Sequence, residues 1–98
     1  MIVITGSATA RPGAFETLRA EALAHSERSR AEDGCLSHRA YVDAADPDRL
    51  FFHEEWRDMA AVAAHFRHPD TQRILAAIRE HAVASDGPVL LEATPVRR

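Results

Sequence analysis

Lysine and asparagine are absent from this sequence of 98 residues, and cysteine occurs only once. The single thiol, Cys35, excludes an internal disulfide and is typical of a protein from a reducing compartment. No apolar stretch reaches the roughly 18 residues that a membrane-spanning helix needs. The N-terminus carries neither the basic nor the apolar region of a secretory signal. We therefore expect a cytoplasmic protein with no membrane partner.

Positive charge is limited and scattered along the chain. All 12 basic residues are arginines, distributed from Arg11 to Arg98 without a cluster, and the net charge is -3. Binding to nucleic acid requires a basic stripe that neutralises phosphates. We therefore exclude nucleic acid as a partner.

Hydrophobic residues make up 46% of the chain and charged residues 28%, which is an ordinary globular balance. A chain of 98 residues has room for one hydrophobic core but not for two. The sequence contains no internal repeat and no low-complexity linker. We expect a single domain over residues 1–98.

The spacing of apolar residues changes between the period of a strand and the period of a helix. Met1 to Ala10 alternates at period two, whereas Phe15, Leu18, Ala22 and Leu23 recur at helical spacing. The same criteria apply along the rest of the chain. They predict a strand at 1–10, a helix at 14–30, strands at 35–43 and 50–56, helices at 59–66 and 70–84, and a strand at 89–96.

Turn and capping residues separate these elements. Gly34 suits the left-handed position after a helix, and Asp58 is a plausible N-cap for the short helix. Turns are expected at 44–49 and at 86–88, where proline, glycine and aspartate gather. The order β-α-β-β-α-β predicts a ferredoxin-like α+β fold, with a four-stranded antiparallel sheet and helices on one face.

Apolar residues occupy both faces of the predicted strands. Val3 lies between Ile2 and Ile4, and Leu91 follows Leu90. A sheet face that met water would alternate to polar side chains. An apolar face without a covering helix usually contacts another chain, most often across a two-fold axis. We expect a homodimer in which two sheets face each other as a shared barrel.

Six histidines are many for this length, but their spacing does not predict a metal site. His65 and His68 could share a helix face, yet Pro69 follows at once and no third ligand has matching spacing. His25 and His81 have no evident partner and are expected to face solvent. We expect the protein to use neither a metal nor another cofactor.

Three short motifs lie in the part of the chain between residues 32 and 66: Glu-Asp-Gly-Cys-Leu at 32–36, Glu54-x-Trp56, and Ala-His-Phe at 64–66. Together they resemble the antibiotic biosynthesis monooxygenase family of dimeric α+β barrels. The likeness extends over nearly the whole chain. The resemblance implies that His65, Glu54 and Trp56 correspond to the family's histidine and its Glu-x-Trp.

Two positions depart from the usual pattern of that family. His38 stands where relatives often have an aromatic residue, and Asp70 stands where many have a second histidine. Haem-degrading members use an asparagine on the first strand. Because the sequence has no asparagine, haem degradation is not expected.

Strand alternation and helical spacing place a common set of side chains toward the helices. His65 lies at the edge of the apolar stripe of its helix, from which it could reach either a pocket or solvent. Glu54 could line the pocket or pair with Arg39 across the sheet. The expected pocket residues besides His65 are His38, Phe52, Glu54, Trp56, Phe15, Val62 and Phe66.

The resemblance implies a cofactor-independent monooxygenase that oxidises a phenolic or hydroquinone-like aromatic with molecular oxygen. Such a substrate supplies the electrons itself. A phenol has a pKa of roughly 10, so a base must favour its anion; His65 is the first candidate and His38 the second. Two alternatives stay open. The protein could bind an aromatic metabolite without turnover, or it could bind haem through a histidine.

Overall fold

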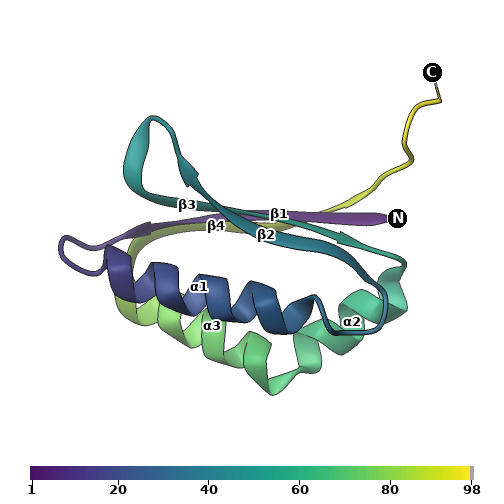
Figure 1. Cartoon of the computed structure of the whole chain (residues 1–98), viewed down its shortest axis with the longest axis horizontal. Helices are drawn as coiled ribbons and strands as arrows, with labels where there is room; N and C mark the ends of the chain where they lie inside the picture. The colour runs from purple at the N-terminus through teal and green to yellow at the C-terminus, as the bar shows by residue number, and fades with distance from the viewer. Residues whose placement is uncertain (98) are drawn as a thin grey trace.

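The computed structural model describes residues 1–97 and consists of one sheet with helices packed against one of its faces (Figure 1). The sheet is antiparallel, with the strand order β2-β3-β1-β4. The elements are β1 (Ile2–Ala10), α1 (Phe15–Ser29), β2 (Cys35–Asp43), β3 (Asp46–Trp56), α2 (Met59–Arg67), α3 (Pro69–His81) and β4 (Ala82–Glu92). This arrangement confirms the predicted ferredoxin-like α+β fold.

The predicted capping residues position α2 against the loop that follows α1. Asp58 Oδ1 accepts a hydrogen bond from the backbone N–H of Ala61 at 2.9 Å, which caps α2. Gly34 has a φ of +83°, and a Cβ at this position would lie 2.5 Å from the Cβ of Ala61. Only glycine therefore fits where the loop crosses α2.

Two boundaries differ from the prediction because strand pairing extends further than the sequence pattern suggests. β3 begins at Asp46 rather than at Leu50, since its pairing with β2 continues to the Asp43–Asp46 pair. α3 ends at His81, and residues 82–86 pair with β1 instead of continuing the helix to 84. Tertiary pairing has overridden the local helical pattern there.

The sequence at 86–88 forms a bulge within β4 rather than the predicted turn. Ser7 pairs with Asp86 and Thr5 with Val89, so β4 carries one extra residue between these pairs. Gly87 has a φ of +90°, and a Cβ on it would lie 2.7 Å from the carbonyl oxygen of Thr5. The residues that favour a turn here allow the strand to shift its register without ending.

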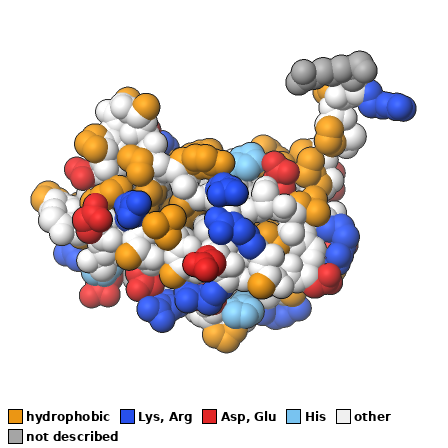
Figure 2. Space-filling view, in the orientation of Figure 1, with side chains coloured by type: hydrophobic (Ala, Val, Ile, Leu, Met, Phe, Trp, Pro, Cys, Tyr) orange, Lys and Arg blue, Asp and Glu red, His pale blue; other side chains and the backbone are white. Residues whose placement is uncertain are grey.

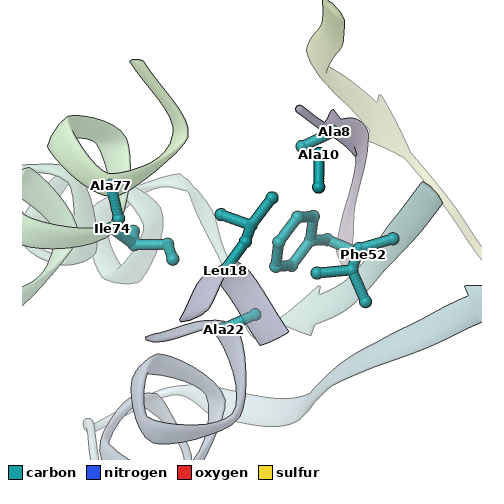
Figure 3. Packing of buried hydrophobic residues seen from close by; sticks show 8 residues of the cluster. Ala8, Ala10, Leu18, Ala22, Phe52, Ile74 and Ala77 are labelled. Atoms are coloured by element: carbon teal, nitrogen blue, oxygen red, sulfur yellow. The ribbon is translucent and has the colours of Figure 1, made fainter. Parts of the chain in front are cut away.

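The core lies between the sheet and the helices and has two apolar clusters. One cluster joins β1, β3, α1 and α3, with Leu18 and Phe52 near its centre (Figure 3). The other joins β1, β3 and α2, and includes Ile4, Trp56 and Val62. Side chains of both clusters border the cavity described below.

The opposite face of the sheet has no covering helix (Figure 1). Leu91 pairs with Val3 and Val89 with Thr5 on this face, and Tyr41 lies opposite Phe51. The side chains of Leu91, Val89 and Tyr41 are about half exposed. This apolar surface, hereafter the open face, is the feature that motivates the homodimer prediction.

Charges of both signs are mixed over the helical layer in the view of Figure 2, where arginines and acidic residues alternate without a uniformly basic area. No helix within residues 1–97 is long and apolar enough to cross a bilayer.

Candidate functional site

Three buried histidines from three different elements meet beneath the sheet. His25 comes from α1, His38 from β2 and His65 from α2, and their exposed fractions are 4%, 0% and 1%. Their ring centroids lie 5.0, 5.3 and 5.6 Å apart. One nitrogen from each ring lies within 4.8 Å of the other two. We call this group the histidine cluster.

Glu54 on β3 brings a carboxylate to the histidine cluster. Its Oε1 lies 3.4 Å from His38 Nε2 and 3.7 Å from His65 Nε2. Trp56 Nε1 donates a hydrogen bond to the same oxygen at 2.9 Å, which fixes the carboxylate. Burial raises the pKa of Glu54 because the charged form is desolvated. Arg39 lies opposite His53 in the sheet, so the alternative pairing of Arg39 with Glu54 is wrong.

The Nδ1 atom of each clustered histidine has its own partner. His25 Nδ1 lies 2.7 Å from Asp70 Oδ2, and His65 Nδ1 lies 3.0 Å from Glu32 Oε2. His38 Nδ1 lies 2.9 Å from Ser26 Oγ. These contacts fix the orientation of all three rings. The far nitrogen of His38, Nε2, is fully buried and has no hydrogen-bond partner.

Burial keeps two members of the cluster neutral at physiological pH. Desolvation, reinforced by the neighbouring His25 and His65, lowers the pKa of His38 to about 3. Desolvation also lowers the pKa of His25, although its hydrogen bond with Asp70 acts in the opposite direction. These rings therefore present lone pairs rather than positive charges to their surroundings.

A cavity of about 130 Å³ opens next to the cluster. An engineered apolar cavity of roughly 150 Å³ binds benzene, so this volume suits a single aromatic ring. The polar part of its lining includes His25, Glu54 and His65 at the cluster, and Thr71 and Asp86 elsewhere in the cavity. Its apolar walls are supplied by β1, β3, α2 and α3, and include Ile4, Phe52, Phe66, Ile74, Leu75 and Ile78.

Sequence and structure comparisons identify the family. Residues 1–77 match the family described as antibiotic biosynthesis monooxygenase. The chain belongs to this family. A crystal structure of an antibiotic biosynthesis monooxygenase is similar, with a TM-score of 0.86 and 28% sequence identity over 97% of this chain and 100% of that protein. The structure of Rv0793 from Mycobacterium tuberculosis has a TM-score of 0.85 and 26% identity, over 99% of this chain and 98% of that one.

A curated relative is longer than this chain. The uncharacterized protein sll1783 from Synechocystis sp. is 35% identical over 68 residues, which cover 69% of this chain and 46% of that protein. The chain thus spans less than half the length of this relative.

In this member of the monooxygenase family, the residues expected at the pocket separate into two groups. Phe52, Glu54, His65 and Phe66 line the cavity. The remaining four lie outside its lining and occupy other layers. His38 lies behind Glu54, Trp56 stacks beside His65 with ring centroids 4.5 Å apart, Val62 belongs to one core cluster, and Phe15 packs against the other.

His25 is buried in the site, so the expectation that it faces solvent is wrong. It continues the buried stripe of α1 that contains Leu18 and Ala22, and Ser29 follows it one turn later. The helical spacing of this stripe was the signal that could have placed His25 inside, whereas Leu23 is 44% exposed. His25 also supplies the third histidine that the spacing argument against a metal site did not find.

Proposed function

We propose that this protein oxidises a small phenolic or hydroquinone-like aromatic with molecular oxygen and needs no bound cofactor for this reaction. The observation that carries the proposal is the ring-sized cavity, in which a buried Glu54–His65 pair faces apolar walls. Membership of the monooxygenase family supports the type of reaction. The cavity volume supports a substrate with a single aromatic ring rather than a polycyclic one.

His65 is the proposed proton acceptor. In this proposal Glu32 accepts a hydrogen bond from Nδ1 of His65, and Nε2, on the side of Glu54, takes the proton. A carboxylate that fixes one ring nitrogen while the other takes a proton is the arrangement found in many catalytic dyads. Removal of the phenolic proton by Nε2 gives the electron-rich phenolate that reacts with oxygen.

Glu54 and His38 have positioning roles in this proposal. Trp56 holds the Glu54 carboxylate by a hydrogen bond to Oε1, and His38 Nε2 lies 3.4 Å from the same oxygen. His38 does not line the cavity, so it acts on the substrate through Glu54. Glu54 in turn orients the hydroxyl group of the substrate toward His65.

The proposed reaction balances without an external reductant. The phenolate transfers one electron to oxygen, and the resulting radicals combine to form a carbon–oxygen bond. Loss of water from this peroxide leaves a new carbonyl group. A hydroquinone and one oxygen molecule thus give a hydroxyquinone and one water, with one oxygen atom in each product. Apolar walls protect the anionic intermediates from premature protonation by solvent.

Oxygen uptake by the purified protein with a panel of single-ring hydroquinones and phenols tests the proposal. Turnover should incorporate one atom of isotopically labelled oxygen into the organic product. Tight binding of the same compounds without oxygen uptake would instead indicate a binding protein. A Soret band on addition of haem would favour the haem-binding alternative.

We further propose that the protein is a homodimer in which two open faces pack together. Three large apolar side chains of this surface are about half exposed in the single chain. Large apolar side chains exposed on an uncovered sheet face are usually buried against a partner, and a two-fold axis lets the same surface serve both subunits. The mass of the protein in solution tests this part of the proposal.

A further inference from the structure

The histidine cluster has features that proton transfer does not require. Three imidazoles and one carboxylate converge from α1, β2, α2 and β3, and all four side chains are largely shielded from solvent. We propose that His25, His38, His65 and Glu54 bind one divalent transition metal ion per chain, of the class of Zn²⁺ or Co²⁺. This inference does not depend on the proposed oxidation.

The separation of the rings fits a metal centre. In a tetrahedral site with metal–nitrogen bonds of roughly 2.05 Å, imidazole centres lie roughly 3.2 Å from the ion and therefore roughly 5.2 Å from one another. The three observed separations are 5.0, 5.3 and 5.6 Å. Metal binding would bring the three ring nitrogens, now up to 4.8 Å apart, about 1.5 Å closer together while their Nδ1 contacts are kept.

Glu54 occupies the position of a fourth ligand. Ligand atoms around a tetrahedral ion of this size are roughly 3.3 Å apart. Glu54 Oε1 lies 3.4 Å from His38 Nε2 and 3.7 Å from His65 Nε2. Three imidazole nitrogens and one carboxylate oxygen form a donor set that suits zinc and its neighbours rather than calcium or magnesium.

The unpartnered nitrogen of His38 provides an independent argument for a ligand. His38 Nε2 is the one buried side-chain polar atom in residues 1–97 that has no hydrogen-bond partner. An unsatisfied buried group of this kind is costly, and most proteins avoid it. This nitrogen faces Glu54 across 3.4 Å. A metal ion bound between them would give this nitrogen a partner.

The contacts of the second ring nitrogen of each histidine are also those expected of metal ligands. Ligand histidines usually hold their second ring nitrogen against a carboxylate or another acceptor, which fixes the ring for binding. His25 and His65 have Asp70 and Glu32 in this position, and His38 has Ser26 Oγ. Arg28 pairs with Asp70 and balances part of the negative charge around the site.

The cavity gives the site its entrance and links it to the proposed oxidation. His25, Glu54 and His65 border the cavity, so an ion can enter the site from there. A redox-inactive ion such as Zn²⁺ would occupy His65 Nε2, which is the proposed proton acceptor. We therefore expect Zn²⁺ to inhibit the metal-free oxidation as it binds.

Titration of the chelator-treated protein with Co²⁺ tests the inference directly. We expect visible absorption bands of a four-coordinate ion that saturate at one Co²⁺ per chain and disappear when Zn²⁺ is added. His38→Phe and His65→Gln should each weaken binding by about 100-fold or more. Asp70→Asn, which changes only an outer contact, should weaken it by roughly 10- to 100-fold.

A matched control separates this site from adsorption on surface histidines. His53 lies on β3 with a partly exposed side chain and is paired with Glu55, away from the cluster. His53→Ala should leave the Co²⁺ spectrum and stoichiometry unchanged. Circular dichroism establishes which variants are folded, and His25→Gln replaces any cluster variant that is not. The inference is overturned if folded cluster variants bind as the native chain does, or if the native chain gives no four-coordinate spectrum. Failure of oxygen uptake alone would leave the binding result intact and would count against the proposed oxidation only.

Discussion

The neutral, buried imidazole of His38 should make the metal-free protein sensitive to mild acid. Its pKa is about 3 in the folded chain and 6.5 as an unperturbed side chain. Between these values the unfolded chain binds a proton at this site and the folded chain does not. Stability is therefore unaffected by His38 above pH 6.5 and falls as the pH decreases toward 3.

The size of this effect follows from the width of the window. Each pH unit below the unperturbed value lowers the free energy of unfolding by about 1.4 kcal/mol for one group. At pH 5 the loss from His38 alone is therefore about 2 kcal/mol, a large share of the roughly 5–15 kcal/mol that stabilises a small domain. His25 contributes in the same direction, because burial lowers its pKa as well. Glu54 opposes both, because burial raises its pKa and protonation in the folded chain relieves that cost.

Urea unfolding of the native chain and of His38→Phe, with a chelator present, isolates the contribution of His38 to the pH dependence of stability. The phenylalanine ring has a similar size and cannot be protonated. Between pH 7 and pH 5 the native chain should lose about 2 kcal/mol more stability than the variant. His53→Ala, which removes a partly exposed imidazole, should follow the native chain. Parallel curves for the native chain and His38→Phe would refute the assignment of a neutral, desolvated His38.

Three further predictions test the site, the open face and the fold. His65→Ala should lower the rate of hydroquinone oxidation by roughly 10² or more while the melting temperature shows a folded protein; an unchanged rate would move the search for the base to Glu54 and His38. Leu91→Glu should yield monomers or unfolded chains in sedimentation, because a charge would be buried without a partner in the dimer; a native chain that sediments as a monomer at micromolar concentration would refute the dimer itself. Gly34→Ala should destabilise the protein by about 1–3 kcal/mol in urea, because of its positive φ and the close approach of α2.

The sequence predicted most of the fold because its signals are local. β2 begins and ends at the predicted residues 35 and 43, where apolar alternation is bounded by Gly34 and by acidic turn residues. Asp58 caps α2 as expected, since a cap depends on only three or four neighbouring residues. β4 was partly missed because residues 82–86 become a strand only through pairing with β1. Pairing between distant segments leaves little trace in the local pattern.

The site was less predictable than the fold for the same reason. Phe52, Glu54 and Phe66 could be assigned to the cavity from alternation and helical spacing. The meeting of His25 with His38 and His65 depends on how α1 and α2 pack beneath the sheet, and no spacing along the chain records it.

The bulge in β4 determines which side chains of the last strand face outward. Before the bulge, Ser85 pairs with the buried Ala8 and therefore points toward the helices. After the bulge, Leu90 pairs with Ile4 and also points toward the helices. The inward side chains of β4 therefore have odd residue numbers before the bulge and even residue numbers after it. The extra residue thus reverses the alternation of the strand, and this reversal puts Val89 and Leu91 on the open face. A chain shortened by one residue at Gly87 would send these two side chains inward and Leu90 outward. The Asp-Gly-Pro segment shifts the register of β4 by one residue. The apolar surface proposed to join two subunits depends on this shift.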